Sequence, residues 1–498
     1  MECSHKYKLR TLIFLETTSL NKADREKAPQ KMLDETIAKL KSFADEKLQK
    51  VKSYKLSQNF TEILRGKRNT LKITLSERTS QNKIHWSIFH IFRRKDSHVE
   101  SKSSAASEET PKVVSFASKN NFSRKKTLKY AVVFGITAFL VYEFAPHRTK
   151  IILSFKNTPE NNALASRLTY LHNQHFYPTV YSFAPLLQSI VNQFMEVNDV
   201  TFEREYLKLQ DGGTIALDWA NPYVKVEDTS KGSKGKYAEV AADENTPTIF
   251  VIHGLTGGSN AGYIRGFVKH AQKRGFRVVV FQHRGVNQPL STPLPYNGGV
   301  LDDLSFAIDH VRAKLPKARL MAVGNSLGGN QLLRYLGQTG ENCPFESAVA
   351  LSCPWDVNKC VNALTGTVYE KFFIKKFAEN SLLPHMGILV ELSKSHGIDL
   401  DQVMSSKSLR MFHDNFTIKV YNYKDSYELF DTYLVKKEQI QNIKIPTLIL
   451  HSRDDPIVVA KDIPKEDIAE NDNIILAETT RGAHICWFTG LKPKRVII

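Results

Sequence analysis

Gly324-Asn325-Ser326-Leu327-Gly328 is the stretch of sequence that decides the fold of this chain. An apolar run at 319–323 comes before it, and a helical pattern follows it through residue 336. A serine between two glycines at a strand-to-helix junction sits on a sharp turn above the sheet, because the small residues let helix and strand approach closely. The motif therefore predicts that Ser326 is a nucleophile at the carboxyl end of a strand.

An acidic turn and then a histidine follow Ser326 along the chain, each after a predicted strand. The acidic turn comes directly after an apolar strand at 447–450, and His484 follows a second one at 474–477. Because functional groups gather at the carboxyl ends of parallel strands, we expect these side chains to converge on the serine. The order Ser…Asp…His is that of the α/β-hydrolases.

Two neighbouring residues, Asp454 and Asp455, compete for the acid position. We expect Asp455 to occupy it, because the apolar residues 456–458 follow it directly, and Asp454 remains the alternative. Serine is a poor nucleophile unless a base takes its proton, and His484 would be that base. The aspartate would orient the imidazole and stabilise its cation without taking the proton itself.

A glycine-rich turn after the strand at 248–252 is the candidate for stabilising charge on a substrate. The turn reads HGLTGG from residue 253 and precedes a helix. Backbone N–H groups aimed at a developing oxyanion lower the barrier to acyl transfer. We expect one N–H from Leu255 and the other from Leu327, the residue after the nucleophile. We interpret His253 as a residue that braces the loop.

Strands alternate with helices over the carboxyl-terminal two thirds of the chain. After a hairpin at 205–219, apolar runs predict strands at 248–252, 278–281, 320–323, 348–351, 447–450 and 474–477. This alternation predicts the α/β class, with a mostly parallel central sheet and helices on both faces. The gap of about 90 residues before the strand at 447–450 is too long for a simple crossover, so we expect a helical lid at about 357–445.

The positive charge is concentrated at the amino-terminal end. Residues 1–130 hold 29 Lys and Arg against 14 Asp and Glu, and the rest of the chain holds 40 against 37. The net charge of +18 therefore belongs mostly to an extension, and we do not expect nucleic acid as a partner. The five cysteines have no paired or metal-binding spacing, so we expect small buried residues, no metal and no cofactor.

One segment is a candidate for membrane anchoring. Residues 130–142 form an uncharged run of 13, and the 20 residues from 127 to 146 carry only Lys129 and Glu143 as charged groups, both near the ends. Basic residues precede the segment, which favours a cytoplasmic amino terminus. The catalytic part would then be lumenal, at the endoplasmic reticulum, where the sequon beginning at Asn415 would be available for glycosylation.

The chain is therefore expected to have three parts. They are a disordered basic extension at 1–123, a signal-anchor transmembrane helix at 124–150, and an α/β-hydrolase domain at 151–498.

Several linked motifs resemble family 4 of the AB hydrolases, a group of membrane-anchored lipases and phospholipases with related medium-chain esterases. They lie between about residues 200 and 490 and are HGLTGGS from 253, YIR from 263, HRG from 283, DDL from 302, GNSLGGN from 324, CPWD from 353 and DDP from 454. The resemblance implies a single amino-terminal anchor followed by a lipid-ester hydrolase. It also implies a triad of Ser326, Asp455 and His484.

We therefore expect a serine esterase that acts on acylglycerols or glycerophospholipids through an acyl-enzyme, with a lipid ester and a membrane as partners and no obligate protein partner. One alternative is an acyltransferase or thioesterase that uses the same triad. His396 and Asp401 match an H-x4-D acyltransferase pattern, but chance matches are expected among 16 histidines. The non-enzyme alternative is a pseudohydrolase that binds lipid, which the intact Ser, Asp and His disfavour.

Overall fold

The computed structural model describes residues 149–179, 184–195, 197, 199–226, 236–490 and 494–495, with scattered residues between 134 and 145. They belong to the second of two compact units, Ser118–Ile498. The extension expected at 1–123 and two thirds of the anchor expected at 124–150 lie outside the described residues. No helix among the described residues has the length and apolar character that a membrane span requires.

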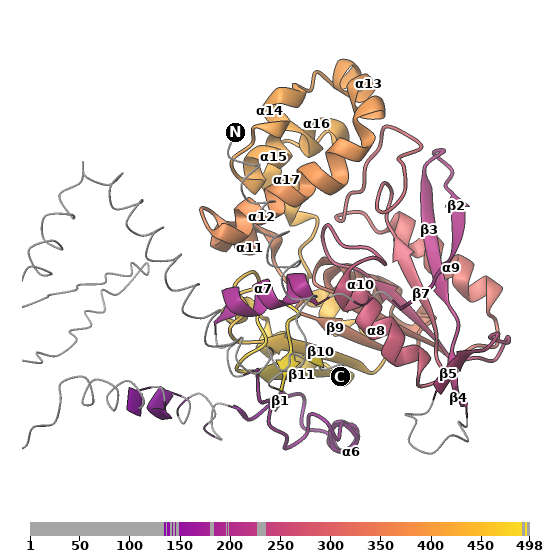
Figure 1. Ribbon diagram of the computed structural model, residues 1–498, viewed down its shortest axis with the longest axis vertical. Coiled ribbons are helices and arrows are strands. Elements are labelled where there is room, and N and C mark those ends of the chain that lie inside the picture. The colour runs from indigo at the N-terminus through magenta and orange to yellow at the C-terminus, as the bar shows by residue number, and fades with distance from the viewer. Residues whose placement is uncertain are drawn as a thin grey trace, which may run out of the picture. The chain divides into compact units, whose positions relative to one another are not determined.

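A nine-stranded sheet forms the centre of this unit (Figure 1). In spatial order its strands are β1 (Ile152–Ser154), β11 (Ile474–Thr479), β10 (Thr447–Ser452), β9 (Ser347–Leu351), β8 (Leu320–Asn325), β6 (Thr248–Ile252), β7 (Arg277–Gln282), β3 (Thr214–Ala220) and β2 (Glu203–Lys208). The six strands from β11 to β7 run parallel, and β1, β3 and β2 pair antiparallel at the edges. This is the mostly parallel sheet that the sequence predicts.

The central strands are apolar throughout because helices cover both faces of the sheet. Along β6, Phe250 and Ile252 pack into a core with α9 (Asp302–Lys314), α10 (Leu327–Thr339) and α19 (Lys465–Glu470). The intervening residues Ile249 and Val251 point to the opposite face, where α8 (Gly262–Gln272) contributes Ile264 and Val268. Alternate residues of a strand face opposite sides of the sheet. A strand buried on both sides therefore reads as a continuous apolar run.

The strand order reverses between β6 and β8. The chain passes from β6 to its neighbour β7, and then returns across β6 to form β8 on the other side. In open α/β sheets, ligands bind outside the carboxyl ends of the strands at such a reversal. The loops after β6 and β8 carry the HGLTGG turn and Ser326, so the topology brings these two motifs together.

A helical insertion separates β9 from β10, although these two strands are neighbours in the sheet. It packs around an apolar core of its own and is drawn in orange, with most of its helices beyond the sheet, in Figure 1. Its helices are α11 (Val357–Leu364), α12 (Val368–Phe377), the π-helix η2 (Ala378–Leu382), η3 (Leu383–His385), α13 (Met386–His396), α14 (Leu400–Met404), α15 (Leu409–Asn415), α16 (Thr417–Tyr421), α17 (Ser426–Asp431) and α18 (Lys437–Gln441). Helices thus occupy the residues for which a lid is predicted.

Smaller elements surround this framework. They are α6 (Pro159–Arg167), α7 (Pro185–Phe194), the hairpin of β4 (Tyr223–Val226) with β5 (Lys236–Glu239), the 3-10 turns η1 (Gly340–Asn342) and η4 (Ala460–Asp462), and the pair of β12 (Phe488–Thr489) with β13 (Lys494–Arg495). The helix α7 matters for the site because a side chain on its inner face reaches the loop after β10.

Candidate active site

Ser326 occupies a sharp turn between β8 and α10. Its backbone has φ 53° and ψ −120°, a conformation that costs a non-glycine residue about 1–3 kcal/mol. The turn fits only because its neighbours lack side chains. A Cβ on Gly328 would lie 2.5 Å from the carbonyl oxygen of Ile252, and one on Gly324 would lie 2.5 Å from that of Gly328. The motif is therefore required by close backbone packing.

The three predicted side chains are joined by hydrogen bonds. The Ser326 Oγ lies 2.7 Å from the Nε2 of His484, and the Nδ1 of the same imidazole lies 2.8 Å from the Oδ2 of Asp455. The side chain of Asp455 is fully buried, and its Oδ1 accepts hydrogen bonds from the N–H groups of Ile457 and Val458. A carboxylate held from both sides keeps the imidazole in one orientation. The arrangement is suited to removing a proton from Ser326.

Asp454, the alternative acid, points away from the imidazole and fixes the histidine loop. Its carboxylate accepts hydrogen bonds from the N–H of Ala483, the Oγ of Ser452 and the side-chain amide of Gln188 on α7. Ser452 Oγ also lies 2.6 Å from the carbonyl oxygen of Ala483. Burial raises the pKa of Asp454, and these hydrogen bonds oppose the rise. Of the two aspartates, only Asp455 contacts His484 in the described structure.

The role of Gln188 is not visible in the sequence. This residue is 266 positions away from Asp454, and α7 carries no motif. Gln188 is a polar residue on the inner side of a helix whose outer side is apolar, and which side faces inward depends on the fold.

The turn after β6 lies directly against the nucleophile. A Cβ on Gly254 would be 3.1 Å from the Cβ of Ser326, so a larger residue there would push against the nucleophile. The N–H of Gly254 donates to the hydroxyl of Tyr263, whose pKa burial raises to about 12. Gly257 N–H closes the turn on the Gly254 carbonyl, 2.9 Å away. Leu255 therefore lies at the tip of a fixed turn beside Ser326.

Two cavities meet at these residues. The first, of about 130 Å³, is lined mainly by apolar side chains of the insertion and has Ser326 and Leu327 in its wall. The second, of about 750 Å³, is wider and has His484 in its wall. Leu255, Phe373 and Ile457 line both. A substrate could therefore place one part in each cavity with its reacting bond at Ser326.

Comparisons with known proteins agree with this fold. Residues 247–469 match the family model described as the alpha/beta hydrolase fold. Phospholipase ABHD3 of Mus musculus is 30% identical over 325 residues, which are 64% of this chain and 75% of that protein. This chain belongs to the α/β-hydrolase family. The Homo sapiens protein of the same name is 31% identical over the same shares of both chains, and the monoacylglycerol lipase of Saccharomyces cerevisiae is 29% identical over 51% of this chain and 58% of its own.

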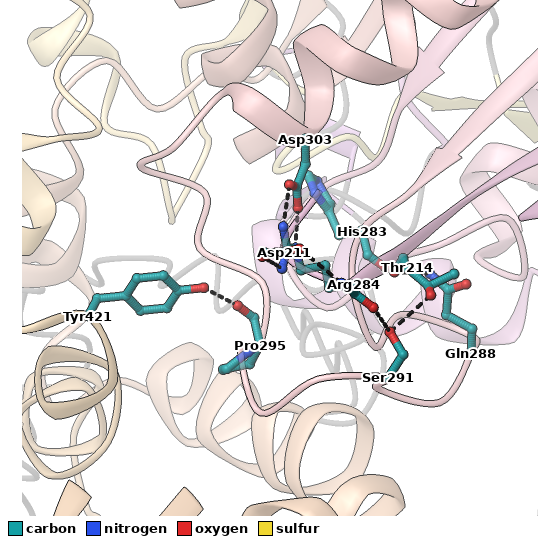
Figure 2. Close-up of polar contacts among 11 residues, drawn as sticks. Asp211, Thr214, His283, Arg284, Gln288, Ser291, Pro295, Asp303 and Tyr421 are labelled. Carbon is teal, nitrogen blue, oxygen red and sulfur yellow. Dashed lines mark hydrogen bonds and ion pairs between the residues drawn. The ribbon is translucent and has the colours of Figure 1, made fainter. Parts of the chain in front are cut away.

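In this α/β-hydrolase the loop after β7 forms one wall of the first cavity. Figure 2 shows how it is fastened. Arg284 forms an ion pair with Asp303 on α9 at 2.6 Å and another with Asp211 at 2.5 Å, and its hydrogen bond to Asp303 raises the pKa of the guanidinium. At the other end of the loop, the hydroxyl of Tyr421 on α16 donates to the carbonyl oxygen of Pro295. The wall is thus attached both to the sheet domain and to the insertion.

His253 lies behind the turn, where it agrees with the predicted bracing role. It is buried, its Nδ1 donates to the carbonyl oxygen of Gly254 at 2.8 Å, and its ring packs edge-on against His283. Burial lowers the pKa of His253 to about 4, and it does the same for His413 in the insertion. Both rings are therefore neutral at physiological pH.

These two histidines predict that the hydrolase loses stability in mild acid. In the unfolded chain these histidines take up protons below their usual pKa of about 6.5, whereas in the folded protein they stay neutral down to about pH 4. The free energy of unfolding therefore falls as the pH falls between these two values. We expect a loss of roughly 2 kcal/mol per histidine between pH 7 and pH 5. The thermal unfolding midpoint at the two pH values measures it. His413→Gln should show a smaller pH dependence than the unaltered chain, and an equal one would contradict the assignment.

Other predicted residues lie away from the site. His396 is exposed at the end of α13, and Asp401 lies in the first turn of α14, so the structure gives the H-x4-D pattern no partner from the triad. Cys353, Cys360 and Cys486 are buried and free, as predicted for small core residues, whereas Cys343 is free but only half-buried and Cys3 lies outside the described residues. In the sequon at Asn415, the Thr417 hydroxyl is within hydrogen-bond distance of His413, and the threonine is buried.

Proposed function

We propose that this hydrolase is a serine esterase that cleaves lipid esters, acylglycerols or glycerophospholipids, through an acyl-enzyme. The observation that carries the proposal is the line of hydrogen bonds from Asp455 through His484 to Ser326, placed at the wall of an apolar cavity. The relatives named phospholipase and monoacylglycerol lipase support an ester of a lipid as the substrate.

In the first half-reaction Ser326 Oγ attacks the ester carbonyl carbon while the Nε2 of His484 takes the hydroxyl proton. The negative charge moves to the carbonyl oxygen, which accepts hydrogen bonds from the N–H groups of Leu255 and Leu327. The ester C–O bond then breaks, and His484 returns the proton to the leaving alcohol. The acyl group stays on Ser326, and Asp455 stabilises the imidazolium throughout.

In the second half-reaction water takes the place of the alcohol. His484 removes a proton from the water molecule, the hydroxide oxygen attacks the acyl carbon, and the same two N–H groups hold the oxyanion. Collapse releases a fatty acid and returns the proton to Ser326. The first cavity suits the acyl chain because the insertion lines it with phenylalanines, and the wider second cavity suits the glycerol part.

The substrate proposal is tested by incubating the full-length chain with a monoacylglycerol and with a glycerophospholipid and measuring the released fatty acid. We expect release from at least one of the two. The assay is repeated with added alcohol to separate hydrolysis from acyl transfer. Predominant formation of a new ester would favour the acyltransferase alternative. Lipid binding without any release would favour a pseudohydrolase.

We further propose that residues 124–150 anchor this hydrolase in the endoplasmic reticulum membrane, with the amino terminus in the cytoplasm. The support is the apolar run at 130–142 and the basic residues before it. Alkaline carbonate extraction of cell membranes tests the anchor, and the protein is expected in the pellet. Release into the supernatant would contradict a spanning anchor. Protease protection of the carboxyl-terminal domain in sealed microsomes then tests the orientation.

A further inference from the structure

Large apolar side chains are exposed around the mouth of the second cavity. On α7, Leu186, Leu187 and Ile190 are 46%, 37% and 45% exposed, and on α12, Val368 and Phe372 are 57% and 38% exposed. All of them except Leu187 also line the cavity that leads to His484. The helix α7 (magenta) and the helix α12 (orange) are found in Figure 1 by their labels. The exposed apolar surface is thus continuous with the route to the active site.

The helix α7 packs Val191 inward but leaves much of its apolar surface exposed, unlike an ordinary surface helix. Its polar Gln188 is buried against Asp454, whereas its leucines face outward. A helix on the surface of a soluble domain normally turns its apolar stripe inward. Leaving apolar side chains in water around a cavity mouth is unfavourable unless another apolar phase covers them.

The positive charge on α12 indicates which apolar phase covers these side chains. Lys371 and Lys375 are exposed and Lys376 is half-buried, while the acidic residue of the same helix, Glu370, is buried and accepts hydrogen bonds from the N–H groups of Gly366 and Leu409. Glu379 in the following turn pairs with two of the lysines. The α7 segment carries no charge. Apolar side chains beside basic ones fit the boundary of an anionic lipid bilayer.

We propose that α7 and α12 form a docking surface that seats the catalytic domain on an anionic phospholipid bilayer with the mouth of the second cavity against the lipid. The leucines and phenylalanine enter the acyl region, and the lysines contact the headgroup phosphates. A lipid ester can then pass from the bilayer to Ser326 along apolar side chains without crossing water. This proposal rests on the proposed esterase function and adds the surface through which the substrate arrives.

The test compares two substrates of the full-length chain. One is a lipid ester in vesicles of phosphatidylcholine and phosphatidylserine, and the other is a water-soluble short-chain ester. Leu187→Asp and the double variant Lys371→Gln/Lys375→Gln change residues that line neither cavity. We expect the double lysine variant to lower vesicle activity roughly 25-fold, since each lysine near an anionic surface contributes roughly fivefold to binding. We expect Leu187→Asp to lower it as well, because the aspartate brings a negative charge to an anionic surface. Hydrolysis of the soluble ester should change less than twofold.

The insertion offers matched controls away from the mouth. Val390→Asp replaces an apolar residue of similar exposure on α13, and Lys394→Gln/Lys407→Gln removes the same charge from exposed positions. These variants should hydrolyse both substrates at the rate of the unaltered chain. Equal losses in the control and docking variants, or equal losses on both substrates, would overturn the proposal.

A binding measurement keeps this result separate from the esterase function. Hydrogen exchange of the Ser326→Ala chain is recorded with and without the same vesicles, so no catalysis is needed. Vesicles are expected to slow exchange in α7 and α12 and to leave α13 unchanged. Protection of both helices before vesicles are added would mean that another part of the chain or a second copy covers them. That outcome, or the absence of any vesicle effect, would overturn the proposal.

Discussion

Replacing Ser326 with alanine is expected to lower ester hydrolysis by about 10⁶-fold. The change removes the oxygen on which the proposed acyl-enzyme forms, and the proposed oxyanion donors, the N–H groups of Leu255 and Leu327, would be left to stabilise only a direct attack by water. A fluorophosphonate probe, which reacts with activated serines, should label the unaltered chain and leave Ser326→Ala unlabelled. Fatty acid release and probe labelling on the same preparations measure both effects. Undiminished labelling of the variant would rule out Ser326 as the nucleophile.

Ser352 provides a matched control for this experiment. It follows β9 as Ser326 follows β8, and its φ of 48° places it in a similarly strained backbone conformation. Its side chain is fully buried, and among the described residues its Oγ has no hydrogen-bond partner. Ser352→Ala should therefore keep its labelling and most of its activity. If Ser352→Ala lost as much activity and labelling as Ser326→Ala, the effect would come from disturbed packing at the carboxyl ends of the strands and not from a lost nucleophile.

Asp455→Asn is expected to lower kcat about 10⁴-fold with little change in KM. The amide cannot stabilise an imidazolium, and its N–H₂ group would donate toward the Nδ1 of His484, which favours the wrong tautomer. The change is nearly isosteric, so the hydrogen bonds that the other oxygen accepts from Ile457 and Val458 can persist. Steady-state kinetics on a soluble ester measure the loss, and circular dichroism controls for folding.

Asp454→Asn is the natural comparison because the two aspartates are adjacent and both lie at the end of β10. The asparagine oxygen can still accept from Ala483 and Ser452, but its amide would face the donor groups of Gln188 and Arg481. We expect a loss of less than tenfold, acting through the position of the histidine loop. A loss at Asp454 larger than that at Asp455 would reverse the two assignments.

The sheet was predictable because burial on both faces leaves a simple signature. The runs at 248–252 and 320–323 read as continuous apolar residues, and both are strands within two residues of the expected bounds. The convergence of Ser326, Asp455 and His484 was predictable for a related reason, since each lies within five residues of the carboxyl end of such a strand. The short edge strand β1, by contrast, was not predicted, because an edge strand needs only three residues and no apolar run.

The sequence favours Asp455 over Asp454 but does not settle the choice between them. Both follow the same strand, and the choice depends on how the turn rotates: one carboxylate faces His484, and the other faces α7 and the backbone of Ala483. That rotation depends on residues far apart along the chain, including Gln188. The packing of the helices within the insertion could not be predicted from the sequence either, because these short helices pack mainly on one another.

The insertion leaves and re-enters the sheet at neighbouring strands, with Leu351 of β9 opposite Leu450 of β10. An insertion of this kind can vary independently of the sheet, because the two strands that carry its ends are hydrogen-bonded to each other. The entropy of closing a chain segment grows only with the logarithm of its length, about 0.6 kcal/mol per doubling. Lengthening or exchanging the insertion therefore adds little to the free energy of forming the sheet. The triad side chains after the strands can stay in place while changes in the insertion alter the size and lining of the first cavity.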